Sequence, residues 1–284
     1  MITSHETRLG SALYGLIFFG TAALLVAGLG QGWSYVGFAL PLVLGHAAVV
    51  GLLERLSPFH RPWNQDQGDR IADRIHYAAN LLVGQASLGL YGIIHVATGA
   101  PSWGLAGLPF GAAWLVGLVL FDLGLYAVHR WSHGGGLLWR LHAVHHSSTR
   151  IYMLNGQRRH VVHEILEGLP GLMALLAAGA PPAVVAAVLG TVTVHLAWQH
   201  SNIAYRLGAL RHIIAGAESH RWHHQRQWRD VQGNYAAVLA PWDRLFKTDL
   251  RRATTAPTDV GMDDEPALPK DWVGQHVWPF RPHG

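Results

Sequence analysis

The sequence predicts an all-α polytopic membrane protein, with about four transmembrane helices, a shallower helical hairpin and a His-rich helical cap on the cytosolic side. Three observations lead to this fold class. Half of the 284 residues are hydrophobic, and only 13% are charged, roughly half the charged share of an average soluble protein. The apolar residues gather in stretches long enough to cross a bilayer, and the Lys and Arg residues gather between these stretches.

Five apolar segments account for most of the predicted helices. The first contains no charge, and the last is broken by the turn sequence AGAPPA at 178–183, which predicts a helical hairpin. The first four pair into membrane hairpins over 9–53 and 81–128. The segments, in chain order, are 9–29, 33–53, 81–98, 103–121 and 165–199.

The cationic residues predict how the chain is oriented. All 21 Lys and Arg residues fall at Arg8, in 55–74, in 130–159 or from 206 onward, whereas the connections GLGQGW, TGAPSWG and AGAPPA carry no charge. By the positive-inside rule, both termini and the basic regions face the cytoplasm. This segregation argues against the alternative of a soluble protein with buried helices. The basic composition then reflects orientation and anionic headgroups, and we expect no nucleic-acid partner.

Two polar, His-rich blocks, 129–164 and 200–248, form the predicted cap. We expect residues 1–250 to form a single integral-membrane domain, and 251–284 to form a C-terminal tail in which WVGQHVWPF provides an apolar anchor. The preference for Arg over Lys and the many Ala and Gly residues suggest a GC-rich bacterium and therefore an inner membrane.

Histidines recur three times at helical spacing, which predicts a metal centre. Residues three or four apart share one face of a helix, so each box can present its imidazoles together. A box of the form HxxHH can direct one imidazole to each of two neighbouring metals. Eight ligands are too many for one tetrahedral zinc and suit two metals. The boxes contain His129 and His133; His142, His145 and His146; and His220, His223 and His224.

The side chains available as ligands narrow the choice of metal. The chain has no cysteine, which excludes disulfides, thiolate sites and iron–sulfur clusters. Imidazole suits iron, zinc, copper or nickel. Hydrolytic zinc sites need only three protein ligands, so eight or more histidines favour a dinuclear redox centre, with iron as the expected metal.

Four segments, in order, resemble the fatty acid hydroxylase/sterol desaturase superfamily of integral-membrane di-iron oxygenases. The resemblance implies a helical membrane protein with two iron ions at its cytosolic face. It also implies O2-dependent hydroxylation, or desaturation, of an unactivated C–H bond of a lipid. The segments are DLGLYAVHRWSH (122–133), WRLHAVHHSS (139–148), SHRWHH (219–224) and NYAAVLAPWDRLFKT (234–248).

Residue by residue, the resemblance implies that the eight box histidines are metal ligands. QHSNI at 199–203 resembles the family segment before the third box and makes His200 a ninth ligand. In RRHVVHE, His160 and His163 are each expected as a ligand or a close supporting side chain, although Val161 stands where relatives often have proline.

Supporting residues are expected around the ligands. Asp122 lies seven residues before His129, two turns back on the same helical face, and is expected to accept an N–H from an imidazole. Asp230 and Asn234 are weaker candidates of the same kind, and so is Glu164.

The implied reaction needs a lipid that enters laterally between the first four helices. It also needs an external electron donor such as a ferredoxin or cytochrome b5, because the sequence contains no haem-binding domain of cytochrome b5 type and no Gly-rich dinucleotide motif.

Two alternative functions stay open: a zinc-dependent lipid hydrolase and a membrane metal transporter. A transporter would need histidines in series across the bilayer, and only His46, His95 and His195 lie deep in the apolar segments.

Overall fold

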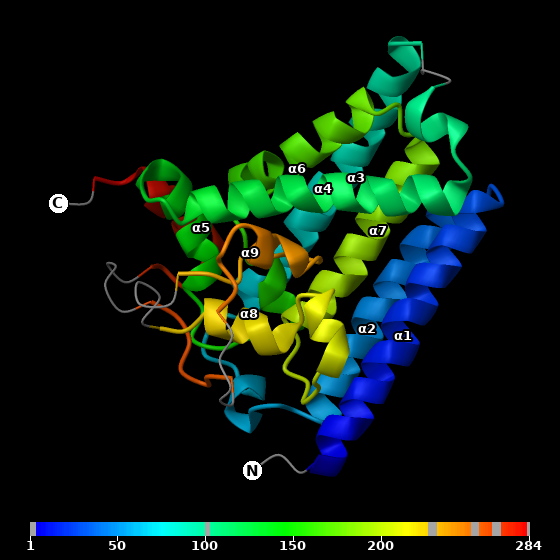
Figure 1. Cartoon of the computed structure of the whole chain (residues 1–284). Helices are drawn as coiled ribbons and strands as arrows, with labels where there is room; N and C mark the ends of the chain where they lie inside the picture. The colour runs from blue at the N-terminus through cyan, green and yellow to red at the C-terminus, as the bar shows by residue number, and fades with distance from the viewer. Residues whose placement is uncertain (1–3, 100–102, 227–231, 251–255, 263–267, 283–284) are drawn as a thin grey trace.

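Long helices run through the apolar segments of the chain, as the computed structural model shows (Figure 1). The structure describes residues 4–99, 103–226, 232–250, 256–262 and 268–282. Within these ranges only three isolated β-bridges interrupt the helical architecture, and no sheet forms. The all-α prediction is therefore confirmed. The long helices are α1 (Ser4–Gly30), α2 (Leu40–Leu56), α3 (Arg70–Ala97), α4 (Phe110–Ser132), α6 (Val161–Ala177) and α7 (Pro182–Gln199).

Shorter elements build the cap and the connections between the long helices. A π-helical turn, η1 (Tyr35–Ala39), leads directly into α2. The short α-helices are α5 (Gly136–His146), α8 (Ala217–His223), α9 (Pro241–Leu245) and α10 (Trp272–Val277). The 3₁₀ turns are η2 (Arg61–Asn64), η3 (Gly104–Gly107), η4 (Met153–Gln157), η5 (Gly208–His212) and η7 (Trp278–Phe280).

Five helical stretches in the described ranges are long and apolar enough to cross a bilayer. Four correspond to the four predicted membrane segments. The fifth is α7, so only α6, with 17 residues, keeps the shorter length expected of the third hairpin. The AGAPPA sequence does form the turn of that hairpin, because α6 ends at Ala177 and α7 begins at Pro182.

Two helix starts differ from the expectation. Helix α3 begins at Arg70 rather than near residue 81, because its polar first turns are buried against the cap instead of ending at the membrane surface. Helix α4 begins at Phe110 rather than near residue 103. Gly104 has a positive φ of 71°, and Pro109 is the N-cap residue, so the chain turns before the helix can start.

Helix α7 is the centre of the membrane bundle. It packs against α1, α2, α3 and α4, and two thirds of its apolar window (67%) is buried inside the protein. Small side chains such as Ala186, Ala187 and Gly190 let these neighbours approach closely. A Cβ at Gly190 would lie 3.1 Å from Leu25 of α1.

Buried ion pairs attach the start of α3 to the loop that follows α5. The Arg150 guanidinium lies 2.6 Å from Asp69, and the Arg158 guanidinium lies 2.6 Å from Asp69 and 2.5 Å from Asp73. Tyr152 donates its hydroxyl to the same Asp73 at 2.5 Å. These pairs stabilise the extra turns of α3 and fix the cap on the bundle.

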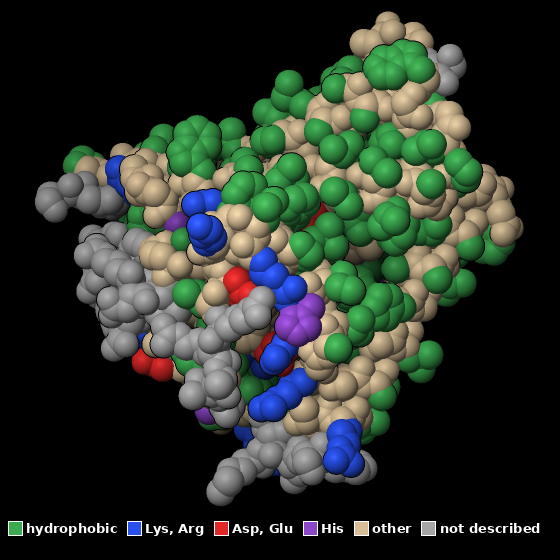
Figure 2. Space-filling model, viewed as in Figure 1, with side chains coloured by type: hydrophobic (Ala, Val, Ile, Leu, Met, Phe, Trp, Pro, Cys, Tyr) green, Lys and Arg blue, Asp and Glu red, His purple; other side chains and the backbone are tan. Residues whose placement is uncertain are grey.

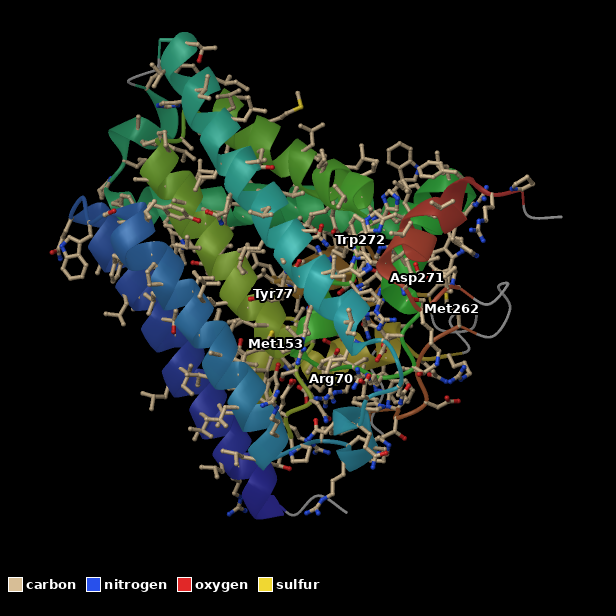
Figure 3. The ribbon with its side chains drawn as sticks, turned by 180° about the vertical axis from the view of Figure 1, so that it is seen from behind. Arg70, Tyr77, Met153, Met262, Asp271 and Trp272 are labelled. Atoms are coloured by element: carbon tan, nitrogen blue, oxygen red, sulfur yellow. The ribbon has the colours of Figure 1, made fainter. Side chains whose placement is uncertain are left out.

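The C-terminal segment docks on the cap. Trp278 is 3% exposed and packs against Trp139 and Ala143 of α5, and His76 of α3 lies 2.6 Å from the Gln275 side chain. Figure 3 shows Asp271 and Trp272 on this segment beside the first half of α3. The segment therefore holds α5 and α3 together, a role that its predicted use as a surface anchor did not include.

The surface has two unequal parts. Figure 2 shows hydrophobic side chains over the long helices, and Lys, Arg, Asp, Glu and His side chains gathered on the other part, where α8 and α9 lie. This division is what a membrane bundle with a polar cap requires.

Helices α4 and α6 touch backbone to backbone at a pair of glycines. A Cβ added at Gly124 would lie 2.6 Å from the Gly171 nitrogen, and one added at Gly171 would lie 2.8 Å from the Phe121 oxygen. We expect Gly124→Ala to separate the two helices and to lower the free energy of unfolding by about 1–3 kcal/mol. Gly111→Ala in the same helix meets open space and serves as the control. Thermal unfolding in detergent measures both, and equal midpoints would contradict the prediction.

Candidate metal centre

The ends of four helices bring nine histidines together. Helix α4 carries the first box at its C-terminus, α5 the second and α8 the third, and His200 directly follows α7. Each ring offers one nitrogen that could bind a metal; these nitrogens divide into two groups, and within each group they lie within 4.8 Å of one another. The first group is His129, His133, His142, His146 and His223; the second is His145, His200, His220 and His224.

The two HxxHH boxes divide between the groups as their spacing predicts. His145 lies in the second group and its neighbour His146 in the first. In the third box, His223 belongs to the first group, whereas His224 belongs to the second. Adjacent residues on a helix point about 100° apart, so one helical turn can serve two metals.

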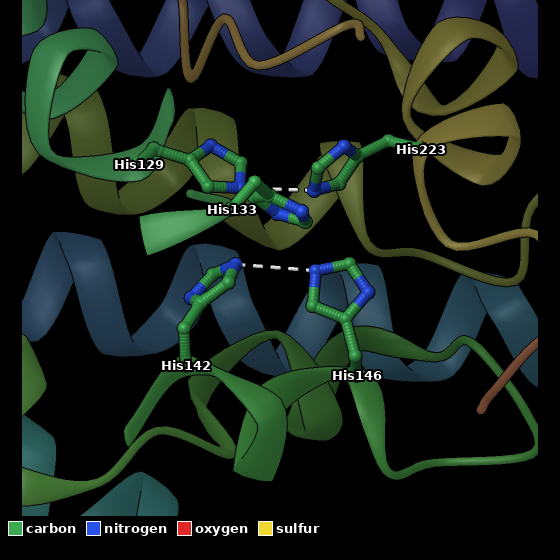
Figure 4. Close-up of side chains that lie close together, drawn as sticks. All are labelled: His129, His133, His142, His146 and His223. Carbon is green, nitrogen blue, oxygen red and sulfur yellow. Dashed lines mark hydrogen bonds between the residues drawn. The ribbon is translucent and has the colours of Figure 1, made fainter. Parts of the chain in front are cut away.

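The nitrogens are spaced as ligands of a common ion would be. In the first group, Nε2 of His129 lies 2.9 Å from Nε2 of His223, and Nε2 of His142 lies 3.1 Å from Nε2 of His146 (Figure 4). Two nitrogens about 2.1 Å from one metal, at a right angle, are about 3.0 Å apart. These distances therefore match neighbouring positions around a transition metal.

The second group repeats this spacing in a row. Nε2 of His200 lies 3.1 Å from Nε2 of His145 and 2.8 Å from Nε2 of His220, which lies 3.0 Å from Nε2 of His224. A neutral imidazole nitrogen has either a hydrogen or a lone pair, so such a row cannot be satisfied throughout by ordinary hydrogen bonds. A metal that accepts the Nε2 lone pairs would satisfy all four of these nitrogens, so the donors fit the ion.

Backbone carbonyls fix two of the rings. Nδ1 of His129 donates to the Tyr235 carbonyl oxygen at 2.7 Å, and Nδ1 of His223 donates to the Gly233 carbonyl oxygen at 2.9 Å. The proton on Nδ1 leaves the Nε2 lone pair free for a metal, which is how second-layer hydrogen bonds prepare imidazole ligands.

Burial keeps the imidazoles of the cap neutral. It lowers the pKa of His146, His220 and His224 well below the ordinary value, and neighbouring imidazoles lower each pKa further. Burial lowers the pKa of His223 to about 4. Neutral rings can bind a metal at neutral pH without first losing a proton.

Asp122 supports the centre in a different way from that predicted. Its oxygens accept hydrogen bonds at 2.9 Å from the backbone nitrogens of Val238 and Leu239 and from Trp242 Nε1, and not from an imidazole. Seven residues rise about 10.5 Å along a helix, so a shared face does not bring this carboxylate to the His129 ring. Asp122 instead holds the 238–242 segment, which continues from Tyr235.

The structure also places the other predicted supporting residues. Asn234 donates to the Ser219 carbonyl oxygen at 3.0 Å and accepts from the Leu250 nitrogen at 2.9 Å, so it ties its loop to α8 without touching a ring. Asp230 lies outside the described residues. Asp243 was missed, although WDRLFKT contains it: it accepts from the backbone nitrogens of Tyr235 at 2.8 Å and Ala236 at 3.1 Å.

His160 and His163 lie outside both groups. His160 caps α6, because its Nδ1 accepts from the Val162 nitrogen at 3.1 Å, and its Nε2 lies 3.1 Å from the His276 carbonyl oxygen. The expected ligand role does not fit this position. His163 is a neighbour of the first group: its ring lies 4.7 Å from that of His142, and its Nε2 lies 2.9 Å from the hydroxyl of Ser132.

The deep histidines of the bundle bond or stack with neighbouring residues of the protein. His46 of α2 lies 2.9 Å from the Thr21 hydroxyl of α1, and His195 of α7 lies 3.0 Å from the Ala215 carbonyl oxygen. The His95 ring stacks on the Tyr91 ring of its own helix. These positions give each ring a packing role and form no series across the bundle.

A cavity of about 120 Å³ lies beside the metal centre, with walls from α2, α3, α4, α6 and α7. Its lining is mostly apolar and includes Leu125 and Leu196, each one helical turn before a grouped histidine. Figure 3 shows another lining residue, Tyr77, on α3 near Met153 of the cap. The cavity can hold an apolar chain close to the two groups.

The chain is similar to one lipid hydroxylase along its whole length and to other relatives over about half of it. A family model described as fatty acid hydroxylase matches residues 114–248. The ornithine lipid hydroxylase OlsE of Rhizobium tropici is 30% identical, in an alignment that covers all of this chain and 89% of the relative. The alkylglycerol monooxygenases of Danio rerio and Homo sapiens are 33% and 31% identical, over 50% and 48% of this chain and 32% and 30% of theirs. No solved structure gives a significant match.

The division of α5 between two groups can be tested with neighbouring substitutions. We expect His145→Ala and His146→Ala each to lower the bound transition metal toward one ion per chain, because each removes a ligand of a different group. The double variant should bind almost none. Metal analysis of purified protein measures the content, with His60→Ala, which lies outside both groups, as control. The prediction is wrong if either single variant loses both ions.

The role of Asp122 can be tested by Asp122→Asn. The amide keeps the size of the side chain but turns an N–H toward backbone and indole donors, so we expect a loss of about 1–3 kcal/mol of stability. Because the Tyr235 carbonyl orients His129, the variant should also lose metal faster to a chelator. Asp259→Asn, at an exposed ion pair with Arg226, is the control. Unchanged chelation kinetics would show that the 234–242 segment does not support the centre.

Proposed function

The chain belongs to the fatty acid hydroxylase family, and on this premise we propose that it uses two iron ions and O2 to hydroxylate an unactivated C–H bond of a membrane lipid. One observation carries the proposal: two groups of buried imidazole nitrogens lie beside an apolar cavity inside a membrane bundle. Hydrolysis would need no such number of nitrogen donors.

Each part of the site has a role in this proposal. Bound iron would supply reductive activation of O2 and the removal of a hydrogen atom from carbon. The two histidine groups would hold the ions. Phe121, Leu125 and Leu196 line the cavity and exclude water from the reacting carbon. The carbonyl groups of Tyr235 and Gly233 keep the protons of His129 and His223 on Nδ1.

We propose hydroxylation rather than desaturation, and an ornithine lipid as the first substrate to test. The relative that aligns over the whole chain is named an ornithine lipid hydroxylase, and the relatives that align over about half of it are named monooxygenases. The lipid would enter laterally from the bilayer, because α2, α3 and α4 contribute walls to the cavity.

The active site would face the cytoplasm of a bacterial inner membrane, since the basic residues lie at the cap end of the helices. Electrons would come from a separate ferredoxin or cytochrome b5, because the chain contains no cysteine for a cluster. Such a partner would dock on the polar surface where α8 and α9 lie (Figure 2).

Lipid analysis tests the proposal. Cells that express the gene should contain a lipid heavier by one oxygen atom, and the product should depend on O2. The variant His146→Ala should abolish it, because it removes a ligand from one of the two groups. Mass spectrometry of total lipids provides the measurement. An unchanged lipid profile, despite iron-loaded protein and an active reductase system, would overturn the proposal.

A further inference from the structure

The wall of the cavity next to the metal centre contains a buried acceptor. Asn80 of α3 is 3% exposed and lines the cavity. Its Nδ2 donates to the carbonyl oxygens of Gln157 at 2.9 Å and Arg159 at 3.0 Å. Two carbonyl acceptors fix the orientation of the amide, because its oxygen could not replace the donor there.

This orientation leaves Oδ1 of Asn80 without a hydrogen-bond partner among the described residues. Buried polar groups are nearly always paired, so an acceptor held in this way indicates a donor that the protein itself does not supply. Because the residue lines a cavity, the donor can belong to a bound molecule.

Two carboxyl groups extend the acceptor character of the same wall. Glu164 and Glu167 of α6 also line the cavity, and both share one cation: Nη1 of Arg159 lies 3.2 Å from the first and 2.8 Å from the second. The wall therefore presents two carboxyl groups and one guanidinium in addition to the free oxygen of Asn80. A phosphodiester or an ether oxygen, which can only accept, would find a poor match here.

The acceptor wall is close to the first histidine group. Oε2 of Glu167 lies 3.9 Å from Nδ1 of His163, whose ring is 4.7 Å from that of His142. His163 thus lies next to both the wall and a grouped histidine. A polar group bound at the wall therefore places the carbon atoms next to it, and not the distant end of a chain, near the metals.

We propose that the cavity recognises a lipid through an N–H donor, from an amide or amino group, paired with Asn80 and the Glu164–Glu167 wall, and that hydroxylation occurs on a carbon close to that group. The inference rests on the proposed function for the reaction itself. The recognition of the N–H group stands independently, because it concerns binding.

Binding separates the two questions. Iron-loaded full-length protein, kept without O2 and reductant, would be titrated with a long-chain amide lipid and with its ester isostere, in which N–H is replaced by oxygen. Native mass spectrometry in detergent measures both affinities. We expect the amide to bind about tenfold more tightly, the size of one buried hydrogen bond. Equal affinities for the wild-type protein would overturn the inference.

Substitution assigns the preference to Asn80. Asn80→Leu removes the acceptor at similar volume and should abolish the difference between amide and ester, whereas Gln65→Leu at an exposed site should preserve it. A folded Asn80→Leu protein that keeps the preference would overturn the assignment. If the variant does not fold, the amide–ester comparison on wild-type protein still decides.

Turnover then tests the position of oxidation. After O2 and a reductant are admitted, fragmentation of the product should place the hydroxyl near the amide, and a hydroxyl at the chain terminus would overturn that part of the inference. No product from either lipid would count against the proposed function while the binding result stands. Equal turnover of both lipids would support the function and contradict the N–H recognition.

Discussion

The structure depends on one constraint: nine imidazoles, eight of them buried and His133 half-buried, must stay neutral and turn toward two points. A buried ring costs free energy unless both of its nitrogens are satisfied, and a charged one costs more. The ends of α4, α5, α7 and α8 therefore meet at one place, where ligands are close enough to share an ion. The membrane bundle buries the rings, and contacts within the cap orient them.

The second layer follows from the same constraint. The loop that contains Gly233 and Tyr235 must present its carbonyl oxygens to two rings, so its own backbone nitrogens need acceptors. Asp122 and Asp243 provide them, one from a membrane helix and one from the cap. Two buried carboxylates thus act on the metal centre through the peptide backbone. Carbonyl oxygens can orient an imidazole without adding a negative charge beside the metals.

The sequence contained most of the fold and the ligands, since both are local patterns. Apolar length and the placement of Arg predict spans, and histidines at intervals of three and four predict a shared helical face. The HxxHH boxes even predict that His145 and His146 separate. His200 was found only by resemblance, because a lone histidine at a helix end has no spacing signal.

Residues whose roles depend on tertiary contacts were harder to predict. Asp122 lies on the same helical face as His129, but a shared face does not predict whether the carboxylate is close enough to bond to the ring. The carboxylate bonds instead to a segment more than a hundred residues away. His160 shares a motif with ligands yet caps a helix. The free acceptor of Asn80 could not be inferred at all, because it depends on carbonyl groups from a distant loop.

The split of each HxxHH box between the two groups also sets an order of events during biosynthesis. The first group needs His223, and the second needs His220 and His224, so both stay incomplete until the last box has been synthesised. By then all five candidate spans have been synthesised. Any metal would therefore complete its ligand set late in the assembly of the chain, after the last span has been made.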